Sequence, residues 1–118
     1  MGKASRDKGK RGERELAEQL RTLGLGPDIR RGQQFSGREA PDIVNLPGIH
    51  AECKRVEALN IWAAMKQAIS ECPEDKVPAV FHRRNNSEWL VTMRLEDWAK
   101  MKQAAPGQPH PARAKAGE

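Results

Sequence analysis

The stretch Ile49–Lys54 most constrains the fold, because apolar and ionisable residues alternate along it. Side chains alternate between the two faces of a β-strand, so the apolar residues would share one face and His50, Glu52 and Lys54 the other. An apolar strand face has to be covered by another element, and charges near a core need compensating partners. The stretch therefore predicts a sheet packed on a helix, with Glu52 and Lys54 projecting together.

The rest of the chain divides into further helix-like and strand-like segments, recognised by their hydrophobic period and by the Gly and Pro residues between them. In chain order they are helix 11–23, strands 28–31, 41–44 and 49–54, helix 59–71, strands 77–82 and 88–93, and helix 95–101. The expected core faces are Leu16, Leu20 and Leu23 in the first helix, Leu59, Trp62, Met65 and Ile69 in the second, and Leu95, Trp98 and Met101 in the third. This order predicts an α/β domain with a central, mixed β-sheet flanked by helices.

Length and charge limit the classes of function. The chain has 118 residues, which fits one domain, and no apolar run approaches the roughly 20 residues needed to cross a bilayer. We therefore expect a cytoplasmic protein with no membrane partner. Residues 1–14 carry six basic and two acidic residues, which favours a polyanionic partner or, alternatively, a solubilising tail. We expect a basic flexible arm over residues 1–10, a folded domain over 11–103 and a disordered tail over 104–118.

Three acidic residues and one lysine occupy positions where the fold would gather them. The turn between the strands is short, so Asp42 and Glu52 would converge on neighbouring strands, and Glu13 would point inward from the first helix. Gathered carboxylates resist ionisation unless a cation shares them, and Mg²⁺ prefers such oxygen ligands. Lys54 would add a compact positive charge beside a phosphodiester. The alternative is structural, with Asp42 in a turn and Glu52–Lys54 as an exposed strand pair.

These residues resemble the motifs of the PD-(D/E)xK nuclease superfamily, with Pro41-Asp42 and Glu52-Cys53-Lys54 as the two signature elements. Within it, the chain is most similar to archaeal and phage-type Holliday junction resolvases. The segment Lys8–Leu16 matches their opening Lys-Gly-x-x-x-Glu-Arg-Glu-Leu pattern, and Ser36-Gly37 matches their loop Ser-Gly. The spacing from Ser36 to Asp42 is shorter than in those relatives.

The resemblance implies a restriction-endonuclease-like fold, a homodimer, and Mg²⁺- or Mn²⁺-dependent cleavage of branched DNA in recombination and repair. The residues that it assigns are metal ligands Glu13, Asp42, Glu52 and the Cys53 carbonyl, the catalytic lysine Lys54, Ser36 near the scissile phosphate, and the helix glutamine Gln67. Two alternatives stay open. One is a nuclease of the same superfamily that acts on flaps, duplex ends or specific sites, and the other is a DNA-binding protein without activity.

Basic residues around these motifs are candidates for DNA contact, because Lys and Arg bind phosphate oxygens. They are Lys8, Lys10, Arg11, Arg30, Arg31, Arg38 and Arg55. Arg83 and Arg84 lie in an expected hairpin turn and would either extend the phosphate track or only solvate the turn. The chain has three Trp, two Phe and no Tyr, which argues against a base-stacking platform for single strands.

Overall fold

The structure, a computed structural model, describes residues 3–32 and 41–104. Its elements, in chain order, are α1 (Lys3–Thr22), β1 (Arg30–Arg31), β2 (Ile43–Val44), β3 (Ile49–Arg55), α2 (Ile61–Glu71), β4 (Val77–Arg83), β5 (Leu90–Thr92) and α3 (Leu95–Ala104). The predicted alternation of helices and strands is confirmed, with boundaries that differ by a few residues except at the start of α1.

The strands form one five-stranded sheet in the order β1-β2-β3-β4-β5. The neighbouring pairs are antiparallel except for β3 and β4, which run parallel along their whole length. Parallel neighbours need a crossover connection, and α2 supplies it, capped at its start by the Asn60 side chain. The predicted α/β architecture with a mixed sheet flanked by helices is therefore confirmed.

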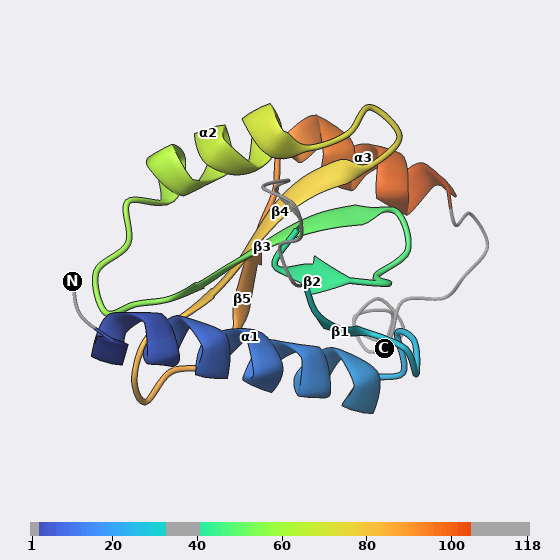
Figure 1. Cartoon of the computed structure of the whole chain (residues 1–118). Coiled ribbons are helices and arrows are strands. Elements are labelled where there is room, and N and C mark those ends of the chain that lie inside the picture. Colours follow the sequence, from blue (N-terminus) through green and yellow to red (C-terminus); the bar gives the residue numbers. More distant parts are fainter. Residues whose placement is uncertain (1–2, 33–40, 105–118) are drawn as a thin grey trace, which may run out of the picture.

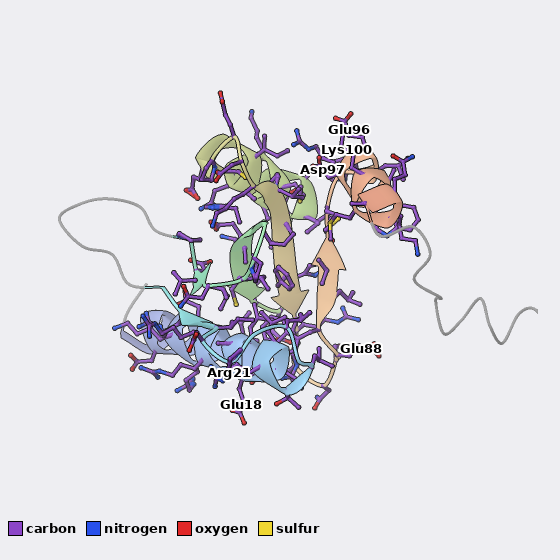
Figure 2. The ribbon with its side chains drawn as sticks, turned by 90° about the vertical axis from the view of Figure 1, so that its right-hand side faces the viewer. Glu18, Arg21, Glu88, Glu96, Asp97 and Lys100 are labelled. Carbon is purple, nitrogen blue, oxygen red and sulfur yellow. The ribbon has the colours of Figure 1, made fainter. Side chains whose placement is uncertain are left out.

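The helices lie in two layers on either side of the sheet. Figure 1 shows α1 below the sheet and α2 and α3 above it, and the turned view of Figure 2 shows the same arrangement, with Glu18 of α1 and Glu96 of α3 pointing outward. The strand alternation separates two cores. Leu16 and Leu20 of α1 pack with Ala51 and Phe81 on one face, among others. On the opposite face, the core consists of Ala64, Met65, Ala68 and Val80.

Helix α1 begins earlier than predicted. It starts at Lys3, so the expected start near Arg11 is wrong. Residues 3–10, which were assigned to the basic arm, belong to the helix. Lys, Arg and Ala in this segment are strong helix formers, and a single Gly9 costs only about 1 kcal/mol against them. Leu23 lies beyond the helix end and is 70% exposed, so it is not part of the core. No helix within residues 3–32 and 41–104 has the length and apolar character to span a membrane.

The predicted core faces of α2 and α3 are partly wrong. Trp62 is 84% exposed and Leu95 77% exposed, and Ile69, Trp98 and Met101 are also exposed. In α2 Met65 is buried as predicted, and Leu59 packs against the same core. The small residues Ala64 and Ala68 face the sheet in place of Trp62 and Ile69, because they allow the helix to approach it closely. An apolar groove remains on the outside, between α2 and the segment that leads into α3.

Candidate active site

The pairing of β2 with β3 places the two predicted acidic motifs opposite each other. The register aligns Ile43 with Ala51 in an antiparallel pair, so the preceding residue, Asp42, lies opposite Glu52. The Asp42 backbone N–H donates to the Ala51 carbonyl at 3.1 Å, which extends the ladder by one bond. The predicted convergence of Asp42 and Glu52 on neighbouring strands follows from this register.

The Asp42 carboxylate is held by the backbone of the next strand. The Cys53 N–H donates to Asp42 Oδ2 at 2.7 Å, the length of a charge-assisted hydrogen bond. Burial raises the pKa of Asp42, while this N–H and the nearby Lys54 ammonium work in the opposite direction. The carboxylate is thus fixed in position, and its negative charge is only partly compensated.

The Glu52 carboxyl group is buried and has a strongly raised pKa. Its side chain is 6% exposed and projects from the face of β3 that α2 covers. Burial, Asp42 and Glu71 together raise the pKa of Glu52 to about 8, and Lys54 offsets only part of this effect. Charge at Glu52 is therefore unfavourable in the protein alone and would be favoured by a bound cation.

Lys54 and Gln67 are in contact, as the resemblance implies for a helix glutamine near the site. The Lys54 ammonium, two residues beyond Glu52 on β3, donates to Gln67 Oε1 of α2 at 3.2 Å. Since the amide oxygen carries no net charge, it orients the ammonium without neutralising it. Lys54 retains two further N–H donors for another ligand.

Glu13 approaches from the other side of the sheet. Its carboxylate accepts a hydrogen bond from Arg31 Nε at 3.1 Å. Burial and the Asp42 charge raise the pKa of Glu13, whereas Arg31 lowers it. Asp42 therefore interacts electrostatically with both Glu13 of α1 and Glu52 of β3.

The tightest cluster of ligand atoms differs from the predicted one. In the part of the chain that the structure describes, one group of three His, Cys, Asp or Glu residues has ligand atoms all within 4.8 Å of one another, and it is His50, Glu52 and Glu71. Glu13 and Asp42 do not belong to it, and His50 and Glu71 were not among the predicted ligands. The strand alternation was the signal for His50, which shares the face of Glu52, but nothing in the sequence marked Glu71.

Two glycines allow the close contacts that shape this region. A Cβ on Gly12 of α1 would lie 2.5 Å from the Arg55 Cβ, so glycine lets α1 lie directly against β3 beside Glu13. A Cβ on Gly32 would lie 2.1 Å from the Pro41 carbonyl oxygen. Gly32 and Pro41 border residues 33–40, which include Ser36 and Arg38, and those two predicted residues lie outside the described part.

The candidate DNA-binding residues fall into two groups. Three are held by acidic or amide partners within the protein. Lys8 lies 3.6 Å from Glu57, Arg31 pairs with Glu13, and Arg55 donates to Asn85 at 3.0 Å. The others in the described part, Lys10, Arg11 and Arg30, have exposed side chains.

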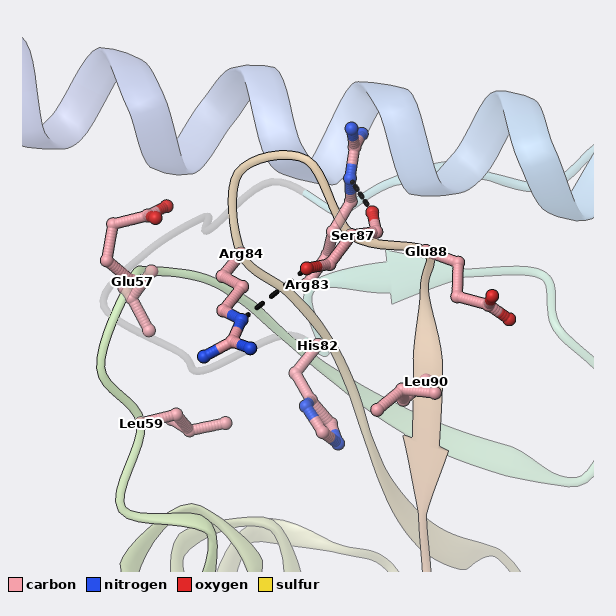
Figure 3. Close-up of a pocket in the computed structure, with 9 residues that line it drawn as sticks. Glu57, Leu59, His82, Arg83, Arg84, Ser87, Glu88 and Leu90 are labelled. Carbon is pink, nitrogen blue, oxygen red and sulfur yellow. Dashed lines mark hydrogen bonds between the residues drawn. The ribbon is translucent and has the colours of Figure 1, made fainter.

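A cleft lies beside the end of β3, and none of the predicted catalytic residues in the described part of the chain lines it (Figure 3). Its lining includes Glu57, His82, Arg84 and Ser87. His82 lies opposite Lys54 in the parallel register. Its Nε2 atom forms a hydrogen bond with Thr92 Oγ1 at 2.9 Å, and burial lowers the pKa of His82.

Arg83 also lines the cleft, but its side chain makes contacts that hold other parts of the fold together. It forms an ion pair with Glu15 of α1 and donates to the Ser87 carbonyl at 2.6 Å. Arg83 therefore has a structural role, which differs from both the phosphate contact and the solvation of the turn that the sequence suggested. Trp89 Nε1 donates to the same Glu15 carboxylate at 3.1 Å, which joins the hairpin to α1.

Comparisons of the chain with models of known protein families, with curated proteins and with solved structures found no match.

Proposed function

We propose that this chain is a divalent-metal-dependent endodeoxyribonuclease of the PD-(D/E)xK type, with a restriction-endonuclease-like fold, that cleaves four-way DNA junctions. The observation that carries the proposal is the pairing of the two motifs. Asp42 lies opposite Glu52 and accepts the Cys53 N–H, while Lys54 projects two residues further along the same strand. Sequence resemblance and strand register thus point to the same residues independently.

The donor set fits a hard divalent cation. Asp42 and Glu52 are carboxylates whose pKa values are raised by burial, and Asp42 contributes to raising that of Glu52. They would hold Mg²⁺ or Mn²⁺, with the Cys53 carbonyl and Glu13 as further oxygen ligands. When bound, the ion would activate a water and stabilise charge on the phosphate. Such ions also keep several coordination positions for water and phosphate oxygens, which suits a site with few protein ligands.

The protein side chains would position and stabilise the reacting phosphate. The Lys54 ammonium, oriented by Gln67, would donate to a non-bridging phosphate oxygen and offset the charge that develops there. The Cys53 N–H fixes the Asp42 carboxylate, so its orientation needs no rearrangement when DNA binds. Glu13 would release Arg31 on engaging the metal, which would make that guanidinium available for a phosphate.

DNA binding is proposed for the exposed basic residues Lys10, Arg11 and Arg30, and for Arg38. Replacing Lys10 and Arg11 together with Gln should weaken DNA binding, and the slope of log K against log salt should fall by about one unit for each phosphate that the protein no longer neutralises. A fluorescence-anisotropy titration at several salt concentrations measures this. An unchanged slope would exclude both residues from the interface.

A homodimer is proposed as the active form, since the two-fold symmetry of a dimer would present two sites to strands of like polarity. The exposed apolar surface formed by Trp62, Leu95 and their neighbours on α2 and α3 is the face assigned to this contact. Trp62→Glu should shift the sedimentation coefficient to that of a monomer, whereas Leu25→Glu, at an exposed leucine away from this face, should not. A monomeric wild-type chain would refute the dimer.

The nuclease proposal is tested by incubating the full chain with a labelled four-way junction and a matched linear duplex, with Mg²⁺ or with EDTA. We expect paired cuts in the junction only, and none in EDTA. Asp42→Asn should abolish cutting and retain junction binding. Cutting of both substrates would instead support a superfamily nuclease with another specificity, and binding without any product would support a DNA-binding protein.

A further inference from the structure

A buried histidine is directed into the carboxylate pair that Glu52 forms with Glu71. The His50 side chain is 5% exposed, and its buried Nε2 atom has no hydrogen-bond partner among residues 3–32 and 41–104. The His50 Nε2 atom lies 3.7 Å from Glu52 Oε1, which is too long for a hydrogen bond. A buried nitrogen without a partner costs about 1–3 kcal/mol, so an occupant that satisfies it would be stabilising.

The distances in this cluster fit a metal ion better than a direct contact. Ligand bonds from His nitrogen and carboxylate oxygen to a transition metal are about 2.0–2.2 Å, so two such ligands at a tetrahedral angle lie about 3.4 Å apart. The 3.7 Å between His50 and Glu52 is close to that spacing. The ligand atoms of His50, Glu52 and Glu71 all lie within 4.8 Å of one another, which leaves room for one ion among them.

The charge states of the cluster also favour a bound metal ion. Burial lowers the pKa of His50, so the imidazole is neutral near pH 7, which is the form that binds a metal. Glu71 helps to raise the pKa of Glu52, first through a side-chain hydrogen bond that favours the protonated form and then through charge repulsion between the two carboxyl groups. A divalent cation would relieve this repulsion. An imidazole nitrogen with two carboxylates favours zinc-like transition metals, whereas Mg²⁺ is usually bound by oxygen alone.

We propose that His50, Glu52 and Glu71 form a binding site for a first-row transition-metal ion of the Zn²⁺ and Co²⁺ class. This site is separate from the magnesium position proposed at Asp42 and shares only Glu52 with it. Its existence does not depend on nuclease activity. If the nuclease proposal also holds, Glu52 bridges the two positions, and occupancy of one affects the other.

The test is a titration of the metal-free full chain with Co²⁺ at pH 7.5, followed by visible absorption, with Zn²⁺ as competitor. We expect one Co²⁺ per chain that Zn²⁺ displaces. Glu71→Gln removes one ligand at a half-buried position and should weaken Co²⁺ binding at least about tenfold, or 1.4 kcal/mol. The matched control Glu74→Gln, in the exposed loop after α2, should leave the affinity unchanged.

Two further variants keep the result interpretable. His50→Gln should remove the nitrogen ligand and change the spectrum of bound Co²⁺, and far-UV circular dichroism of each variant shows whether it folds. Asp42→Asn should abolish Mg²⁺-dependent cutting and keep the 1:1 Co²⁺ stoichiometry. Loss of Co²⁺ binding in Asp42→Asn but not in Glu71→Gln would place the ion at the nuclease position and overturn this inference. Absence of Co²⁺ binding to the wild-type chain would overturn it as well.

Discussion

Replacing Glu52 with glutamine should make the metal-free protein more stable at alkaline pH, although it removes a group central to the proposed chemistry. The amide is close in shape to the protonated carboxyl group and never ionises. In the folded chain the pKa of Glu52 is about 8, against 4.5 for an unperturbed glutamate. Because the folded pKa is raised, stability from the protonated group is fully present below pH 4.5 and is lost as the pH rises through 8.

The size of this effect follows from the shift. One pKa unit corresponds to about 1.4 kcal/mol, so the wild-type chain should lose about 5 kcal/mol in total through this one group once the pH is well above 8. Between pH 5 and pH 9 the change is about 4 kcal/mol, since part of the loss has already occurred at pH 5. His50 has the opposite dependence, because its lowered pKa destabilises the fold on acidification. Because His50 is present in both proteins, its contribution to the pH dependence largely cancels in the comparison.

The assay is urea unfolding of the wild type, Glu52→Gln and the exposed-loop control Glu74→Gln in EDTA at pH 5, 7 and 9. The stability of Glu52→Gln relative to wild type should rise by several kcal/mol across this range, and that of Glu74→Gln should stay constant. Adding Mn²⁺ at pH 9 should restore the free energy of unfolding of the wild type and should not raise that of Glu52→Gln. A difference between Glu52→Gln and wild type that does not vary with pH would refute the reasoning.

Two further substitutions test packing and positioning. Gly12→Ala should destabilise the protein by about 1–3 kcal/mol, because the new Cβ would lie 2.5 Å from the Arg55 Cβ. Gly9→Ala on the same helix meets no atom of the described residues within 4 Å and should stabilise the protein by about 0.5–1 kcal/mol. Thermal denaturation compares the two, and equal effects would contradict the close approach of α1 to β3. Gln67→Ala should lower kcat for junction cutting about tenfold, because Lys54 would no longer be oriented, and leave the Kd for DNA unchanged. An unaltered kcat would exclude a positioning role.

The sequence predicted those features that depend on local pattern. The alternation of Ile49–Lys54 determined both β3 and the shared face of Glu52 and Lys54, and the short turn before it determined the antiparallel partner. Helical spacing located α2 but only part of its buried face, namely Met65. Spacing alone cannot distinguish a wide face containing Trp62 from a narrow one built on Ala64 and Ala68, since that choice depends on how closely the sheet approaches.

The ligand cluster around Glu52 depends on tertiary contacts that no single segment encodes. Glu71 is the last residue of α2, and the crossover geometry of that helix over the parallel pair β3–β4 carries it back toward Glu52. A helix-terminal glutamate usually faces solvent, so its sequence context predicts nothing about this contact. The same crossover brings Gln67, one turn earlier, to Lys54.

The position of α2 therefore couples the two proposed sites. Residues Gln67 and Glu71 are one turn apart on the helix and lie over Lys54 and Glu52, which are two apart on β3. A substitution that moves α2 relative to the sheet would change both contacts at once.

Ala68, which is fully buried between Gln67 and Glu71, is the position where added volume would move α2. Ala68→Val should thus reduce both Co²⁺ affinity and junction cutting, whereas Ala63→Val, on the exposed side of the same helix, should reduce neither. Independent responses of the two activities to Ala68→Val would show that α2 does not link the sites.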